Sequence, residues 1–281
     1  MRFDGATSGP VVGITICTHG NEPCGLAAAN AVLNHFKTKE RLQYGTLYLV
    51  LNNLEGALRH SRLIDINMNR LPSDVFHSKK RGYEIRRSKQ LRPIWECFEY
   101  ALDIHSTTQD NGPMLIAVGK ELPIKLTRGF PMDKLVSNID KIQIGKPAAS
   151  FYGTSRKPAR VFGIECGAHQ ASATFARAET SALALLKNLQ MISGRTRTRR
   201  KTYKEYRVRE SVMFPDASYE LLKIPENFAF LPKGTVIAKG ENQSIKMRRG
   251  GHTLMAYTKK PKNRREEVLF LTEPMKLRYI K

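Results

Sequence analysis

A chain of 281 residues is long enough for one large folded domain or two smaller ones. Its composition, 41% hydrophobic and 26% charged, is that of a globular protein and excludes a largely disordered chain. Lysine and arginine number 47 against 25 aspartates and glutamates, and the net charge of +22 attracts anions such as nucleic acid, acidic membrane surfaces or acidic small molecules.

The cysteines and the apolar runs indicate a compartment. None of the four cysteines forms a C-x-x-C pair, so a cysteine-rich zinc knuckle is not expected. A chain this long does not need a disulfide framework, and we expect reduced thiols. The sequence has neither a charged start followed by an apolar segment nor an apolar run of membrane-spanning length. We therefore expect a cytoplasmic protein without a membrane partner.

The first hundred residues alternate between apolar runs and polar chain. Buried strands are predicted at 11–17 and 45–51, with a helix at 25–33 between them. Residues 54–87 are polar and rich in arginine, and such long irregular segments are often functional. A helical period returns at 88–102. Its apolar face holds Leu91, Ile94, Trp95, Phe98 and Leu102.

Strands and helices continue to alternate in the next hundred residues. Strand-like runs occupy 101–105, 114–118 and 161–166, and a long helix is predicted from 173 to 192. This alternation is typical of an α/β domain, which we assign to residues 1–194.

The composition changes after residue 194. Residues 195–209 are dense in positive charge, and short β-type runs separated by proline and glycine follow. These runs are residues 219–224, 235–238, 253–257 and 268–271. We expect a small all-β domain over residues 195–281.

A histidine and a glutamate three positions apart, His19 and Glu22, follow the first predicted strand. Imidazole and carboxylate both suit zinc, and a catalytic zinc takes three protein ligands and leaves a position for water. His105 ends its own strand, and the carboxyl ends of parallel strands lie at one edge of a sheet. These side chains form a candidate site for one zinc, which lowers the pKa of water toward about 7.

Glu165 ends a further strand among small and apolar neighbours. It is a candidate to take the proton of that water and later give it to the leaving amine. A salt-bridged carboxylate at a strand end is the alternative interpretation.

Two arginines between the metal motifs, Arg62 and Arg70, are flanked by apolar residues and are hard to explain as a solvated face. The planar guanidinium suits carboxylates and polarised carbonyl oxygens. Tyr152 and Arg156, shortly before the Glu165 strand, add a further pair of donors. A structural ion-pair network is the alternative for any one of them.

Five motifs occur in a fixed order: H-x-x-E, R-x-I-D-x-N-x-N-R, D-I-H-S-T-T, Y-x-x-x-R and I-E-C-G. Together they resemble the aspartoacylase and succinylglutamate desuccinylase family of zinc amidohydrolases. The motifs span residues 19 to 165, and the β-rich C-terminal segment fits the family's two-domain layout. The resemblance implies a carboxypeptidase A-like α/β fold, a mixed sheet flanked by helices, with a small C-terminal all-β domain.

The same resemblance implies a role for each matching residue. The ligands of one zinc per chain are His19, Glu22 and His105. Glu165 matches the general base, and Arg62 matches the arginine that polarises the scissile carbonyl. The residues that match carboxylate ligands are Asn69, Arg70 and Arg156, with a site tyrosine at Tyr152. Tyr257 resembles a tyrosine contributed by the C-terminal domain, and Asn67 stands where family members usually carry aspartate.

The expected function is a zinc-dependent deacylase that cleaves a small anionic N-acyl amino acid into a carboxylate and a free amino acid. One alternative is a zinc carboxypeptidase that acts on peptide C-termini. The other is a nucleic-acid binder that uses residues 195–209, a run without a recognisable recognition motif. The sequence leaves open the acyl group, the amino acid and the oligomeric state, a homo-oligomer included.

Overall fold

The computed structural model describes residues 1–108, 112–119, 122–196, 201–223, 225–256, 267–275 and 278–280. The strands before residue 194 are β1 (Arg2–Asp4), β2 (Thr7–Ile16), β3 (Tyr44–Leu51), β4 (Tyr100–Thr107), β5 (Met114–Gly119), β6 (Lys134–Ser137) and β7 (Arg160–Ala168). The later strands are β8 (Lys201–Met213), β9 (Glu220–Leu221), β10 (Phe230–Leu231), β11 (Val236–Lys239), β12 (Ser244–Lys246), β13 (Gly251–Leu254), β14 (Glu267–Pro274) and β15 (Arg278–Ile280).

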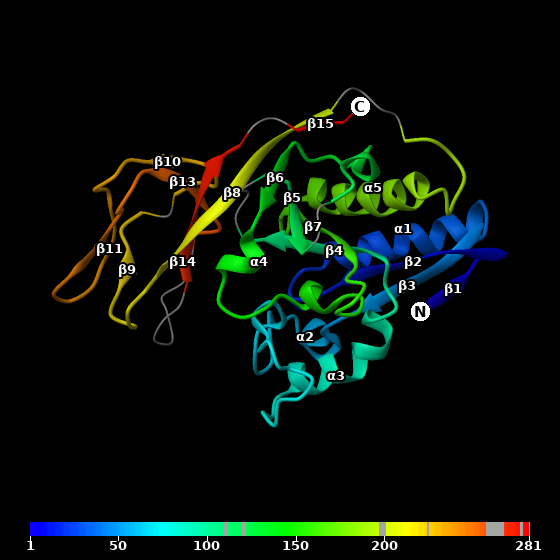
Figure 1. Cartoon of the computed structure of the whole chain (residues 1–281), viewed down its shortest axis with the longest axis horizontal. Helices are drawn as coiled ribbons and strands as arrows, with labels where there is room; N and C mark the ends of the chain where they lie inside the picture. Colours follow the sequence, from blue (N-terminus) through cyan, green and yellow to red (C-terminus); the bar gives the residue numbers. More distant parts are fainter. Residues whose placement is uncertain are drawn as a thin grey trace.

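A 12-stranded mixed sheet connects both parts of the molecule, in the order β1-β3-β2-β4-β7-β5-β6-β8-β14-β13-β10, with β15 beside β8 (Figure 1). Its centre is parallel: β2 pairs with β3 and β4, and β4 pairs with β7. β5 runs antiparallel to β7, which makes the sheet mixed. The central strands are buried on both faces, which explains their nearly continuous apolar sequences.

Helices cover both faces of this sheet. α1 (Cys24–Thr38) and α5 (Ser172–Asn188) lie side by side on one face, and α2 (Leu54–Leu58) and α3 (Tyr83–Trp95) lie on the other (Figure 1). The shorter elements are α4 (Ile139–Ile142) and the 3-10 turns Met68–Arg70, Ile124–Thr127 and Ala148–Phe151. The predicted mixed sheet with flanking helices is confirmed. Among the described residues, no helix has the length and apolar character needed to cross a membrane.

Two predicted helices end earlier than the sequence pattern suggests. The helix expected over 88–102 begins at Tyr83 and ends at Trp95. The amide of Glu99 then donates to the carbonyl of Val11 at 2.8 Å, which draws the following apolar residues into β4. The helix expected to reach residue 192 ends at Asn188, because the chain turns into the left-handed region at Gln190, with φ of 60°.

Residues 201–209 of the basic run become part of the main sheet, in β8. β8 pairs in parallel with β6 on one edge and antiparallel with β14 on the other. The strands β12, β11 and β9 form a separate sheet with its own small core around Phe214, Ile237 and Leu269. The expected β-rich C-terminal region is therefore confirmed, whereas a division into folding units at residue 194 stays a prediction.

Candidate functional site

The loop between β2 and α1 carries His19 and Glu22 to the carboxyl edge of the parallel strands. The loop can pass close to α2 because residue 20 is glycine. A Cβ atom at Gly20 would lie 1.9 Å from the carbonyl carbon of Gly56, so no side chain fits there. The amide of Glu22 donates to the carbonyl of His19 at 3.2 Å, which turns both side chains to the same side.

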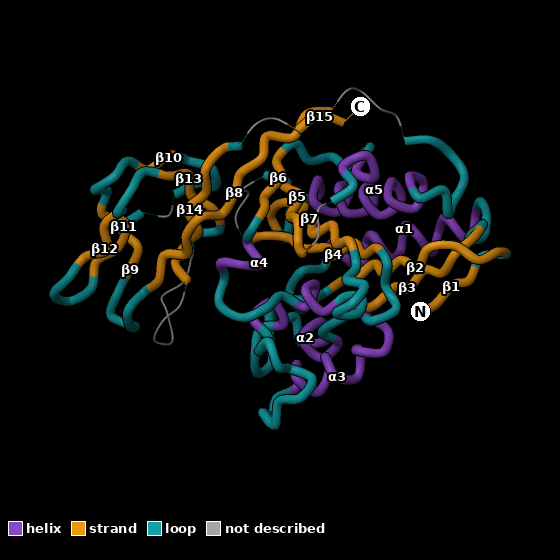
Figure 2. The backbone as a smooth tube through the Cα atoms, in the orientation of Figure 1, coloured by secondary structure: helices purple, strands orange, loops and turns teal. Residues whose placement is uncertain are grey.

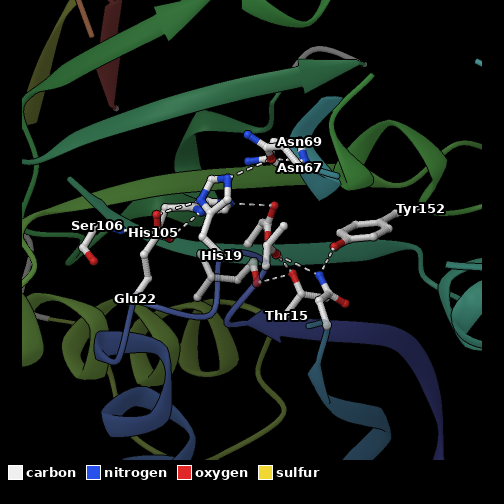
Figure 3. A network of polar contacts seen from close by, with 12 residues as sticks. Thr15, His19, Glu22, Asn67, Asn69, His105, Ser106 and Tyr152 are labelled. Atoms are coloured by element: carbon white, nitrogen blue, oxygen red, sulfur yellow. Dashed lines mark hydrogen bonds and ion pairs between the residues drawn. The ribbon is translucent and has the colours of Figure 1, made fainter. Parts of the chain in front are cut away.

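The carboxylate of Glu22 lies between two imidazoles (Figure 3). Its Oε1 is 2.7 Å from Nδ1 of His19, and its Oε2 is 2.8 Å from Nδ1 of His105. The three side chains are almost wholly buried, and their candidate ligand atoms lie within 4.8 Å of one another. Two imidazole nitrogens and a carboxylate facing one point match the ligand set of a catalytic zinc site.

The second nitrogen of each imidazole has a fixed partner. Nε2 of His105 lies 3.1 Å from Oδ2 of Asp103, and Nε2 of His19 lies 3.0 Å from Oδ1 of Asn67. The hydroxyl of Thr15 donates to the other oxygen of Asp103 at 2.7 Å. Such partners fix the ring orientation and the tautomer of a metal-binding histidine. The donors present therefore fit a bound metal.

Burial and charge set the protonation of this cluster. Burial lowers the pKa of His19 to about 4, helped by the positive charge of Arg62. Burial alone would lower the pKa of His105 as well, but Asp103 and Glu22 raise it well above its ordinary value. Burial opposes ionisation of Glu22, yet the two imidazoles hold its pKa well below the usual range. At neutral pH the cluster keeps a charged carboxylate and a neutral His19.

Glu165 lies directly opposite His105, because β4 and β7 pair in parallel with these residues in register. Its side chain is buried, and its Oε2 has no hydrogen-bond partner among the described residues. Burial raises the pKa of Glu165 well above its usual value; His105 opposes this shift and Glu22 adds to it. A buried carboxylate with a raised pKa and a free oxygen holds a proton more readily than an ordinary glutamate, as a group that receives protons must.

The segment before α3 is largely irregular (Figure 2). One buried carboxylate, that of Glu84, organises it. Its oxygens accept hydrogen bonds of 2.6, 3.0 and 3.1 Å from the amides of Ile64, Asp65 and Ile66. The side-chain Nδ2 of Asn53 also donates to it, at 3.1 Å. These bonds hold Arg62 at the edge of the cluster, where its Nη1 lies 3.4 Å from Oε1 of Glu22 while 48% of the side chain stays exposed.

Asn69 and Arg70 continue this segment with different surroundings. Asn69 lies close to Asn67 and His19, and its Oδ1 is buried without a hydrogen-bond partner among the described residues (Figure 3). The guanidinium of Arg70 instead pairs with Glu267 of β14 at 2.6 Å. The structure therefore brings Asn69 to the cluster and turns Arg70 toward the C-terminal region.

Tyr152, expected as a site tyrosine from the family resemblance, lies behind the cluster. Its ring packs against Trp95 and Phe98, and 2% of the residue is exposed. Its hydroxyl accepts a 2.9 Å hydrogen bond from Asn52, which also donates to Thr18. Burial raises the pKa of Tyr152 well above its usual value, so the hydroxyl stays neutral. The tyrosine supports the site from the core.

Arg156 does not approach the cluster either. It is exposed on a turn before β7, and its neighbour Lys157 pairs with Glu99, just before β4, at 2.7 Å. From the first residue of β7 to Glu165 the chain rises roughly 16 Å, at about 3.3 Å per residue. The turn thus lies at the amino edge of the parallel strands, opposite the site. Tyr257 lies outside the described residues.

Several residues of the site were not predicted from the sequence. Asp103 left a usable signal, because residues two apart on a strand point to the same face and His105 follows it at that spacing. Thr18 also bonds this carboxylate, at 3.1 Å. Nδ1 of His169 lies 2.8 Å from the hydroxyl of Ser106. No such signal marked His169, Glu84 or Glu267, because their partners are distant in sequence.

Comparison with known proteins identifies the family. Residues 8–168, more than half of the chain, match the succinylglutamate desuccinylase/aspartoacylase catalytic domain. The chain therefore belongs to this family. Two curated relatives are N-acyl-aromatic-L-amino acid amidohydrolases (carboxylate-forming). The Rattus norvegicus protein is 29% identical over 125 residues, or 41% of this chain and 39% of that protein. The Mus musculus protein is 28% identical over 116 residues, or 38% of this chain and 36% of that protein.

Solved structures share the fold over almost the whole chain. Murine aminoacylase 3 superposes with a TM-score of 0.72 and 18% identity, covering 96% of each chain. Succinylglutamate desuccinylase from Vibrio cholerae superposes with a TM-score of 0.75 and 15% identity, covering 99% of this chain and 86% of that one. At such identities the likeness concerns the fold, including the placement of the C-terminal region.

Proposed function

We propose that this protein is a zinc-dependent amidohydrolase that cleaves an N-acyl amino acid into a carboxylate and a free amino acid. The observation that carries the proposal is the convergence of two imidazoles and a carboxylate on one point, with the free oxygen of Glu165 on the adjacent strand. Family membership and the amidohydrolase relatives support the same reaction class. The four free thiols are consistent with a reducing compartment such as the cytoplasm.

In this proposal, the imidazoles of His19 and His105 and the carboxylate of Glu22 would hold one zinc ion. Zinc in such a site supplies a Lewis acid that polarises a carbonyl and makes water more acidic. Asp103 and Asn67 keep both imidazoles oriented through the opposite ring nitrogens. The protein part of the chemistry is then proton transfer and charge stabilisation.

Glu165 would take a proton from the attacking water at its free Oε2 and return it to the nitrogen of the leaving amine. The raised pKa of Glu165, caused chiefly by burial, makes its carboxylate a stronger base than an ordinary glutamate for the first step. Arg62 would donate N–H hydrogens to the carbonyl oxygen as negative charge develops there. The side chain of Arg62 is partly exposed and, among the described residues, its polar contact is the 3.4 Å one with Glu22, which leaves donor hydrogens for the substrate.

A screen of N-acyl amino acids with the zinc-loaded protein tests this function, with Glu165→Gln as the matched variant. Glutamine keeps the shape of the side chain but cannot accept the proton. We expect kcat to fall by about a hundredfold or more, in the range of general-base catalysis, with zinc still bound. Near-normal turnover in Glu165→Gln would show that the carboxylate is structural. No hydrolysis of any N-acyl amino acid by the wild-type protein would refute the proposed function.

A further inference from the structure

A cavity of about 340 Å³ lies where β5, β6 and α4 meet β8 of the C-terminal region (Figure 1). Part of its wall consists of side chains from three neighbouring strands of the main sheet, namely Ala117 of β5, Leu135 and Ser137 of β6, and Glu205 and Arg207 of β8. Its volume falls within the range of small-molecule pockets, about 300–1,000 Å³. The cavity is therefore large enough for a small ligand that contacts both parts of the molecule.

This cavity is separate from the metal cluster. Gly119, which lines it, pairs with the first residue of β7, whereas Met114 pairs with Glu165. Along β5 these two positions are roughly 16 Å apart, at about 3.3 Å per residue. The faces of the sheet differ as well, because Leu135 belongs to the core beneath α1 and α5 and Glu165 shares its face with Val161 of the other core. A ligand in the cavity would not touch the cluster.

The carboxylate of Asp140 is the acidic group of this cavity whose partners are known. The residue is buried, and its Oδ2 accepts a 3.1 Å hydrogen bond from the amide of Gly119. Lys146 contacts the main-chain carbonyl of Asp140 at 3.3 Å and not its carboxylate. Among the described residues no cation pairs with this carboxylate, although buried charges are usually paired. An ammonium group in the cavity would pair with it, and Glu205 adds a second acidic side chain to the wall.

A cationic group lies close to Asp140. Arg207 pairs with Ser137 in the register of β6 and β8, and Asp140 follows Ser137 by three residues. The side chain of Arg207 is exposed and has no hydrogen-bond or ion-pair partner among the described residues. Its planar guanidinium suits a carboxylate. Lys141, which is also exposed, lines the same cavity. The cavity thus presents partners for a positive and a negative group side by side.

The remaining lining is apolar. Leu122 and Leu135 are buried in the wall, and Ile124 and Met275 are partly exposed beside them. An apolar group that covers these side chains is stabilised by about 25 cal/mol for each Å² removed from water. A simple metal ion would leave this wall uncovered and Arg207 unused. The lining therefore fits a molecule with an ammonium group, a carboxylate and an apolar body.

We infer that this cavity is a second binding site, which takes a free α-amino acid with an apolar side chain. The ammonium group pairs with Asp140, the carboxylate pairs with Arg207, and the side chain packs against Leu122 and Leu135. The inference does not rest on the proposed function, since the site shares no residue with the metal cluster.

Calorimetric titration of the full-length, zinc-loaded protein with L-leucine tests the inference. Two analogues with the same carbon skeleton separate the charged groups: 3-methylbutylamine lacks the carboxylate, and 4-methylpentanoate lacks the ammonium group. We expect L-leucine to bind at least about tenfold more tightly than either analogue, because each analogue loses a hydrogen bond between charged groups. Equal affinity for L-leucine and one of the analogues would overturn the assignment to an amino acid.

Two variants locate the bound ligand. Asp140→Asn removes the charge and keeps an oxygen for the amide of Gly119, and Arg207→Gln changes an exposed side chain, so that it should fold even if Asp140→Asn does not. Each should weaken L-leucine binding by about tenfold to a hundredfold, the range of one hydrogen bond to a charged group. Arg207→Gln should leave the binding of 3-methylbutylamine unchanged. Wild-type affinity for L-leucine in either variant would overturn the inference.

Asp133→Asn and Arg209→Gln are the matched controls. Both residues are exposed, both lie near the cavity in the sequence, and neither lines it. They remove the same charges as the two test variants and should keep the wild-type affinity for L-leucine. An equal loss of affinity in the controls would mean that overall charge governs binding, and the inference would be wrong.

His105→Ala separates this site from the metal cluster. A free amino acid is also a product of the proposed reaction, so L-leucine bound at the cluster must be distinguished from L-leucine bound in the cavity. His105→Ala changes the cluster and leaves the cavity lining intact, and it should retain L-leucine binding with the same sensitivity to Asp140→Asn. Loss of binding in His105→Ala would place the ligand at the cluster and overturn the inference. Since no turnover is measured, the result is independent of whether the proposed function holds.

Discussion

The two halves of the site are built in different ways. The half that holds His19, Glu22, His105 and Glu165 comes from the ends of three parallel strands and the loop before α1. The half that holds Arg62 to Arg70 is an irregular segment, fixed by Glu84 on one side and by Glu267 on the other. The proposed metal ligands and proposed base thus depend on sheet geometry, whereas the proposed substrate contacts depend on hydrogen bonds and ion pairs between distant segments. Variants in each half should therefore fail in different ways.

Loss of a ligand in the strand-built half should have the largest effect. His105→Ala removes one imidazole and leaves Oδ2 of Asp103 without the nitrogen it faces, so we expect loss of activity and of most of the zinc. Metal content per chain after dialysis measures this. Cys24→Ser is the control, because its thiol contacts the carbonyl of His105 at 3.6 Å without belonging to the cluster, and it should keep about one zinc per chain. Full zinc occupancy in His105→Ala would contradict the assignment.

Arg62 lies where the two halves meet, and its loss should be the next largest effect. Arg62→Gln should lower kcat by about 10²- to 10³-fold, as for the loss of one oxyanion donor, equally for acidic and neutral substrates. The positive charge of Arg62 also lowers the pKa of Glu165 against the stronger effect of burial. Removing it favours the protonated carboxyl, so the acid limb of the kcat/KM profile should move to higher pH. A limb that stays in place or moves down would contradict this electrostatic role.

Glu84→Gln should affect the loop-built half and spare the metal. Glutamine cannot accept as strongly from three successive amides, and we expect the free energy of unfolding to fall by about 1–3 kcal/mol. Turnover should fall with the disturbed placement of Arg62, while zinc content stays normal. Glu55→Gln, which alters an exposed pair with Arg59, is the control and should change stability by less than about 0.5 kcal/mol. Loss of zinc in Glu84→Gln would erase the distinction between the halves.

The smallest effect is expected at Tyr152. Tyr152→Phe removes the hydroxyl that accepts from Asn52 and keeps the packing against Trp95. Denaturant unfolding should show a loss of about 0.5–1.5 kcal/mol, the usual value of one hydrogen bond. KM should not change, because the ring lies behind the cluster. A clear rise in KM would instead support Tyr152 as a substrate contact.

The same division explains what the sequence could predict. His19, Glu22, His105 and Glu165 follow apolar runs whose parallel pairing brings their ends together, so local pattern and one rule of topology suffice. The mixed sheet and its covering helices follow from the same alternation. The end of α3 at Trp95 could not be predicted, because the apolar spacing of the next residues fits a helix as well as a strand. The hydrogen bond from Glu99 to Val11 decides in favour of the strand.

Residues whose role depends on distant partners could not be predicted in the same way. Arg70 has the sequence context of a carboxylate ligand, but its partner Glu267 lies almost two hundred residues later in the chain. Arg156 fits its motif by spacing, yet the turn that carries it faces the opposite edge of the sheet. In both cases the residue type is compatible with substrate binding, and only the fold shows that the group is engaged or remote.

The parallel pairing of β6 with β8 has a consequence for any shortened form of the chain. A protein ending at residue 194 would keep every residue of the metal cluster but would leave one side of β6 without its neighbour. The amides and carbonyls of that strand would then be unpaired, beside the apolar Leu135 and Val136. Such an unpaired edge can pair with a strand of another molecule. Residues 1–194 on their own would therefore tend to self-associate and precipitate. In the full chain, β8 of the C-terminal region covers this edge of β6.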